Sequence, residues 1–144
     1  MKTIKILFCS IMMFAAISCK QNEPSLNLTP KDALVVDMQN NYQTVLPIGG
    51  DSLILDEYNF LTSANGHVDF LHFGKVNYLI EIDEIPDNKW YSKISLVPYN
   101  GYILFFDNGK EELARLMVTN YYEDEQHNIS GARIILQYLW IPSK

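Results

Sequence analysis

The sequence has few of the residues and motifs that identify a function. Two cysteines among 144 residues are too few for a disulfide framework. Lysine and arginine total 11 against 17 acidic residues, and the net charge of −6 gives no positive field for nucleic acid or an anionic membrane. The chain contains no G-x-S-x-G elbow and no glycine-rich phosphate loop. The sequence therefore predicts no nucleic-acid partner and no cofactor, and it offers no catalytic motif.

The hydrophobic content is that of a folded protein. Hydrophobic residues make up 48% of the chain and aromatic residues 12%, which argues against wholesale disorder. A length of 144 residues corresponds to one domain.

The first residues have the pattern of a secretion signal. Lys2 and Lys5 precede an apolar run over residues 6–17, which is shorter than the roughly 20 residues that a transmembrane helix needs. The run ends in Ala16-Ile17-Ser18-Cys19, which resembles a bacterial lipobox. This resemblance implies that residues 1–18 are removed and that Cys19 carries a diacylglycerol anchor. The alternative is a conventional leader with an incidental cysteine.

Lipidation at Cys19 has consequences for charge and location. Removal of residues 1–18 takes away two lysines, so the mature chain carries nine basic and 17 acidic residues, a net charge of −8. Anionic head groups repel such a chain, and the acyl chains are then its sole membrane contact. Lys20, rather than an aspartate, follows the cysteine, and this favours the outer membrane, with the periplasmic or surface face left open.

The rest of the chain divides into a tether and one domain. Residues 19–32 are polar with two prolines and predict a lipidated cysteine followed by a flexible linker. Residues 33–144 consist of short apolar segments separated by turn pairs such as Asn65-Gly66 and Asn108-Gly109. This spacing predicts an all-β, mainly antiparallel fold, a small β-sandwich or β-roll with at most one short helical turn, at residues 110–113.

The clearest strand pattern is in residues 76–83. Val76, Tyr78, Ile80 and Ile82 alternate with mostly polar residues, which predicts a strand that forms a hairpin with residues 90–97. Further strands are expected at residues 34–38, 53–55, 68–70, 102–106 and 132–140, near Phe60, and from about Ala114 to Tyr122. Residues 102–106 are apolar on both faces and predict a central strand.

The histidines and acidic residues give no clear site. His67 and His72 are five residues apart and face opposite sides of an extended strand, so a metal site shared with His127 would need a bend. Acidic clusters at residues 83–87 and 107–111 lack the regular spacing of a calcium loop. We expect no metal site. A pair of carboxylates for glycoside hydrolysis stays open, because two acids in a cleft suffice for it.

Aromatic residues gather in the C-terminal half of the chain, in a number that a small core cannot take up entirely. An exposed Tyr or Trp is a common platform for a sugar ring or a protein partner. The candidate ligand-binding residues are Trp90, Tyr91, Tyr99, Tyr121 and Tyr122. The alternative for each of these rings is that it fills the core.

A set of residues resembles a known family. The set is Gly74-Lys75-Val76-x-x-Leu79-x-x-Ile82-x-x-Ile85-Pro86-x-x-x-Trp90, Val97-Pro98-x-x-Gly101-Tyr102, Ala114-Arg115-Leu116-x-Val118, Ile129-x-Gly131-Ala132-Arg133 and Gln137-Tyr138. Over about residues 34–142 it is similar to Bacteroidetes lipoproteins classed as a domain of unknown function. The resemblance implies a secreted, lipid-anchored β domain without an established activity.

Together these features favour a non-enzymatic, lipid-anchored binding module of the cell envelope with an extracellular glycan or protein as its ligand. Two alternatives remain open. One is a subunit of an envelope or surface assembly, which would show an unpaired strand edge or an apolar patch. The other is a small hydrolase with paired carboxylates.

Overall fold

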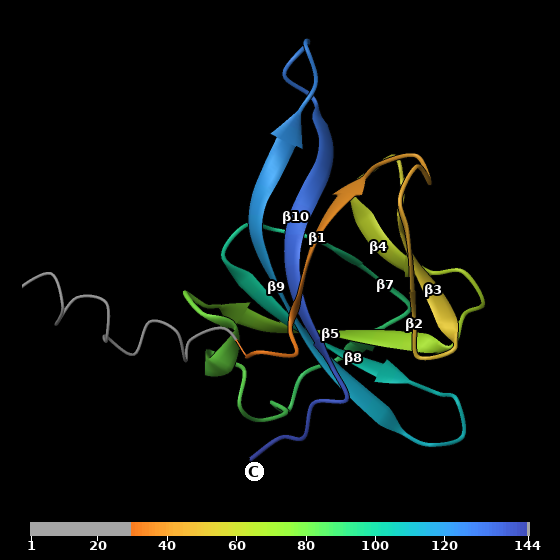
Figure 1. Ribbon diagram of the computed structural model, residues 1–144, viewed down its shortest axis with the longest axis vertical. Coiled ribbons are helices and arrows are strands. Elements are labelled where there is room, and N and C mark those ends of the chain that lie inside the picture. The colour runs from red at the N-terminus through yellow and green to blue at the C-terminus, as the bar shows by residue number, and fades with distance from the viewer. Residues whose placement is uncertain (1–29, 144) are drawn as a thin grey trace, which may run out of the picture.

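The computed structural model describes residues 30–143, which form two antiparallel β-sheets packed face to face (Figure 1). The all-β, antiparallel, sandwich-like fold expected from the sequence is confirmed. The predicted leader, Cys19 and most of the predicted tether lie outside the described residues. No helix among residues 30–143 is long and apolar enough to cross a bilayer.

The larger sheet has six strands and the smaller has four. The larger sheet contains, in spatial order, β1 (Leu34–Gln39), β10 (Ile129–Tyr138), β9 (Glu112–Glu123), β8 (Asn100–Phe106), β5 (Val68–Lys75) and β6 (Trp90–Tyr91). The smaller sheet contains β2 (Val45–Ile48), β3 (Asp51–Leu55), β4 (Phe60–Ser63) and β7 (Lys93–Ser95). The helical element of residues 30–143 is the short 3-10 turn η2 (Leu79–Glu81).

The main core lies between the two sheets and follows from the alternation of side chains along the strands. Leu104 and Phe106 of β8 and Leu53 and Leu55 of β3 are almost completely buried there. Tyr102 is also buried, and its hydroxyl donates to the carbonyl of Ser95 at 3.0 Å. This hydrogen bond ties β8 of the larger sheet to β7 of the smaller sheet.

A second apolar cluster covers part of the outer face of the larger sheet. Leu71, Ile103 and Met117 of three neighbouring strands form its base, and the segment of Val76, Leu79 and Ile82, together with Trp140, covers them. A charged side chain, that of Arg115, lies at the edge of this cluster. It is buried, and its guanidinium donates to the Ile82 carbonyl at 2.8 Å. The cluster leaves the rest of that face uncovered.

The predicted strand at residues 76–83 is wrong. These residues form a loop around η2, in which Val76, Leu79 and Ile82 are buried, while Tyr78 is 46% exposed. The buried residues Val76, Leu79 and Ile82 are three positions apart, which is the repeat of a 3-10 turn with one side on the sheet. In the expected strand, every second residue would be buried. Ile82 packs so closely on Gly101 of β8 that a Cβ at Gly101 would lie 2.6 Å from its Cδ1.

The predicted hairpin of residues 76–83 with 90–97 is therefore also wrong. Trp90 pairs with Leu71 of β5 in the larger sheet, whereas Ile94 pairs with Leu61 of β4 in the smaller sheet. The chain changes sheets between β6 and β7. The one short helical turn that the sequence allowed at residues 110–113 is not found there, since β9 begins at Glu112, and the 3-10 turn η2 lies at Leu79–Glu81 instead.

Other strand predictions are confirmed. β1, β3, β4 and β5 contain the expected segments, β10 contains the segment expected at residues 132–140 up to Tyr138, and β8 lies centrally between β9 and β5 as its apolar faces predicted. The segment expected from about Ala114 is β9, and it returns through β10 as a long hairpin. Trp140, the last residue of the segment expected at residues 132–140, lies beyond β10 and packs in the outer cluster, after the backbone leaves the extended conformation at Leu139, where φ is 57°. The sequence reasoning did not predict β2.

A 3-10 turn and a strand at residues 76–83 predict different losses of folding stability when Leu79 and Ile80 are each replaced by alanine. Leu79→Ala removes a side chain that is 1% exposed and should lower the free energy of unfolding by about 2–5 kcal/mol. Ile80→Ala, at a partly exposed position, should cost clearly less. Denaturant unfolding of both variants measures the difference. A larger loss for Ile80→Ala would contradict the 3-10 turn and restore the strand.

Candidate functional site

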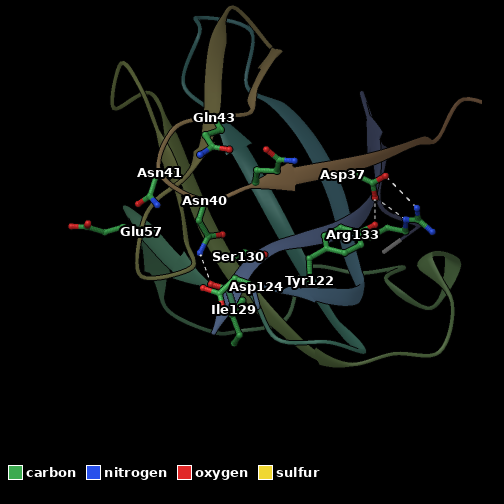
Figure 2. Close-up of a pocket in the computed structure, with 11 residues that line it drawn as sticks. Asp37, Asn40, Asn41, Gln43, Glu57, Tyr122, Asp124, Ile129, Ser130 and Arg133 are labelled. Carbon is green, nitrogen blue, oxygen red and sulfur yellow. Dashed lines mark hydrogen bonds and ion pairs between the residues drawn. The ribbon is translucent and has the colours of Figure 1, made fainter. Parts of the chain in front are cut away.

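A groove with a volume of about 650 Å³ lies between the β9–β10 hairpin and the β1–β2 turn (Figure 2). Its size falls within the roughly 300–1,000 Å³ that small-molecule sites occupy. The lining residues are Asp37, Gln39, Asn40, Asn41, Gln43, Glu57, Tyr122, Asp124, Ile129, Ser130 and Arg133. Only Ile129 among them has a purely apolar side chain.

The hairpin wall exists because β9 and β10 are longer than their neighbours. β8 pairs with β9 only from Glu112 to Met117, so the remainder of β9 pairs with β10 alone and projects from the body of the protein (Figure 1). Thr119 is the extra residue of a bulge in this projecting part, since Asn120 pairs with Arg133 and Val118 with Ile134. A bulge increases the local twist and turns the hairpin relative to the sheet.

The opposite wall is a tight turn with an unusual backbone. Asn41 and Tyr42 both have positive φ values, 61° and 62°, and the amide of Gln43 donates to the carbonyl of Asn40. Two consecutive positive φ values are what a type I′ turn requires, and Asn is a favoured residue there, whereas Tyr is not. The turn is therefore a strained element at the rim of the groove.

Asn40 joins the two walls. Its backbone amide donates to the Ser130 carbonyl at 2.9 Å, and its side-chain Nδ2 donates to the Ile129 carbonyl at 3.3 Å (Figure 2). The residue is only 5% exposed, and its Oδ1 accepts no hydrogen bond from the described atoms. Buried polar atoms are nearly always paired, so this oxygen is an unused acceptor beside the groove.

Three side chains on the outer face of the sheet form a fixed polar group. Arg133 of β10 lies directly opposite Asp37 of β1, and its Nε and Nη2 donate to the two carboxylate oxygens at 2.7 Å and 3.2 Å. Tyr122 of β9 donates its hydroxyl to Asp37 Oδ1 at 2.5 Å. The guanidinium carbon also lies 6.0 Å from the Tyr122 ring centroid. The tyrosine ring is held in one orientation by both neighbours (Figure 2).

These contacts change the protonation of the group. The hydrogen bonds from Arg133 and Tyr122 lower the pKa of Asp37 from 3.8 to about 2. A lowered pKa in the folded state means that the ion pair stabilises the fold above about pH 4, and that this stabilisation is lost as the pH falls toward 2. The hydrogen bond to the Asp37 carboxylate raises the pKa of Tyr122. Both groups keep their ordinary charge at neutral pH.

The other two carboxylates of the groove differ from Asp37. Asp124 shapes the hairpin turn, since its Oδ1 accepts the backbone amides of Gln126 and Asn128 at 2.9 Å and 2.8 Å. Glu57 comes from the β3–β4 turn at the outer rim, and its side chain points away from Tyr122 and Arg133 (Figure 2). The carboxylates therefore stand on three separate elements.

Two of the five candidate aromatic residues are neighbours on β9 but face opposite sides of the sheet. Tyr122 is half-buried and lines the groove. Tyr121 packs against the main core, where its hydroxyl donates to the carbonyl of Leu96. Burial raises the pKa of Tyr121.

The other three candidates lie away from the groove. Trp90 packs against the outer cluster, with its ring edge-on to Phe105 at 6.2 Å between centroids. Tyr91 is 47% exposed at the edge strand β6, and Tyr99 is 62% exposed in the β7–β8 turn. The groove thus contains Tyr122 alone of the five.

The structure gives the histidines separate environments. His72 Nε2 lies 2.7 Å from Asn100 Oδ1, and His127 pairs with Glu123 at 3.5 Å on the exposed hairpin. Within residues 30–143, no group of three or more His, Cys, Asp or Glu side chains is arranged to hold a metal ion.

The sequence reasoning found one residue of the groove, Tyr122, and missed the other ten. All of these except Ile129 have ordinary polar side chains, and they converge from β1, the β1–β2 and β3–β4 turns and the β9–β10 hairpin only in the folded chain. The sole local signal was the Asn40-Asn41 pair, a typical turn former. No family model, curated protein or solved structure matches this chain. Any function must be argued from the groove itself.

The coupling of Tyr122 to Asp37 can be measured by titration. Asp37→Asn removes the negative acceptor and leaves Arg133 beside the hydroxyl, so the pKa of Tyr122 should fall. The phenolate absorbance of each protein, minus that of its Tyr122→Phe counterpart, isolates this residue from the other tyrosines. An unchanged or higher midpoint in Asp37→Asn would show that the hydrogen bond is not made in solution.

Proposed function

We propose that this chain is a lipid-anchored cell-envelope protein, akin to the Bacteroidetes lipoproteins that its sequence resembles, and that its groove binds an extracellular glycan. The observation that carries the proposal is the lining of the groove, in which polar side chains surround one tyrosine ring held by the Asp37–Arg133 pair. The function is binding without catalysis.

A sugar ring suits such a lining better than an apolar ligand does. Sugar hydroxyls both donate and accept hydrogen bonds, and the amide side chains of Gln39, Asn41 and Gln43 can do both as well. The apolar face of a sugar ring can stack on the ring of Tyr122.

The carboxylates support binding rather than hydrolysis. A glycosidase needs a general acid with a raised pKa next to a second carboxylate. The pKa of Asp37 is instead lowered, to about 2, by the donors that surround it. Asp124 is engaged by backbone amides of its own turn. Asp37 is therefore not suited to donate a proton at neutral pH.

Binding is tested first with a glycan array and then by calorimetry with the best ligand. Tyr122→Ala should weaken the affinity about tenfold, because a stacked ring contributes about 1–1.5 kcal/mol. Tyr99→Ala is the matched control, since Tyr99 is 62% exposed and lies outside the groove. An equal loss in both variants, or no glycan bound by the folded protein, would contradict the proposal.

Membrane attachment is tested separately at Cys19. Cys19→Ser removes the thiol that would carry the lipid, so incorporation of a labelled fatty acid should be abolished and the protein should leave the membrane fraction. Cys9→Ser, within the predicted leader, is the control and should leave both properties unchanged. Continued labelling of the Cys19→Ser protein would contradict lipidation at this residue.

A further inference from the structure

The charges of the groove are unequal. Its lining has three carboxylates, those of Asp37, Glu57 and Asp124, and a single basic side chain, that of Arg133. Both oxygens of Asp37 accept hydrogen bonds from this guanidinium, so its charge is already balanced within the protein. No other lysine or arginine lines the groove. An anionic ligand would therefore meet carboxylates without a free cation.

The same carboxylates are poorly placed for a cationic ligand. Asp37 is occupied by Arg133, and Asp124 Oδ1 by the two backbone amides of the hairpin turn. Glu57 is left, and it points outward at the rim (Figure 2). A ligand amine loses water when it binds, and the groove has no pair of free carboxylates to compensate for that loss.

We propose that the groove selects uncharged oligosaccharides and rejects those that carry carboxylate or sulfate groups. This inference rests on the proposed glycan-binding function and specifies its ligand class. Neutral hydroxyl and acetamido groups match the amides of Gln39, Asn41 and Gln43, whereas each negative charge on a ligand is repelled by the carboxylates of Glu57 and Asp124. Glu57 acts here as a specificity-determining residue at the rim, because its carboxylate has no hydrogen-bond or ion-pair partner among the described residues and its charge is left uncompensated.

The experiment compares matched ligands on the full chain carrying Cys19→Ser. An array with neutral, amine-bearing, uronic-acid and sulfated glycans identifies the best ligand. That ligand is compared by calorimetry with the same oligosaccharide oxidised at C6 to a carboxylate. The carboxylate form should bind at least about tenfold more weakly, and added salt should reduce the difference.

Charge variants of the protein test the assignment to Glu57. Glu57→Lys should reduce the difference in affinity between the neutral ligand and its carboxylate form, because it replaces a repulsive charge by an attractive one. Glu84→Lys changes the net charge equally at an exposed residue outside the groove and should leave this difference unchanged.

The outcomes separate this inference from the proposed function. A preference for uronic-acid, sulfated or amine-bearing glycans, lost in Tyr122→Ala, would overturn the inference and leave glycan binding intact. The absence of any glycan binding by the folded chain would overturn both. An equal effect of Glu57→Lys and Glu84→Lys would show that net charge, and not the groove, sets the preference.

Discussion

The rest of the structure depends on the mismatch in length between β9 and β10 and the strands around them. β9 has 12 residues and β10 has 10, whereas β8 has seven and β1 has six. β8 pairs with β9 only as far as Met117, although the buried core continues to Val118 on β9 and Ala132 on β10. The end of the hairpin beyond these residues projects, and together with the β1–β2 turn it encloses the groove. Core and groove are thus two parts of the same pair of strands.

Much of the fold could be predicted because burial acts locally on a strand. The alternation of residues in β10 predicts one face on the core, and the apolar residues on both faces of β8 predict a central strand. The segment of Val76, Leu79 and Ile82 misled the same reasoning, since its apolar residues fit both a period of two and a period of three. The deciding contact, Ile82 against Gly101, joins residues 19 positions apart, and no local pattern contains it.

The groove was far less predictable for a related reason. Asp37 and Arg133 are 96 residues apart, and only the register of β1 with β10 brings them together. Polar surface residues carry no periodic signal, because solvent tolerates them anywhere on an exposed face. The aromatic content suggested exposed rings, but the structure distributes the candidate rings over the core, the sheet edge and the groove. Composition alone gives the number of such residues and no information about where they converge.

The direction of β1 has a consequence for the way the protein faces its surroundings. Leu34 pairs with Leu136 where the chain enters the sheet, and Gln39 pairs with Gly131 at the groove. With a rise of about 3.3 Å per residue, the strand carries the chain roughly 17–20 Å from its entry point to the groove. An acyl anchor at Cys19 would pull on the entry end. Under the proposed lipidation, the linker would therefore join the domain at the end of β1 that lies away from the groove.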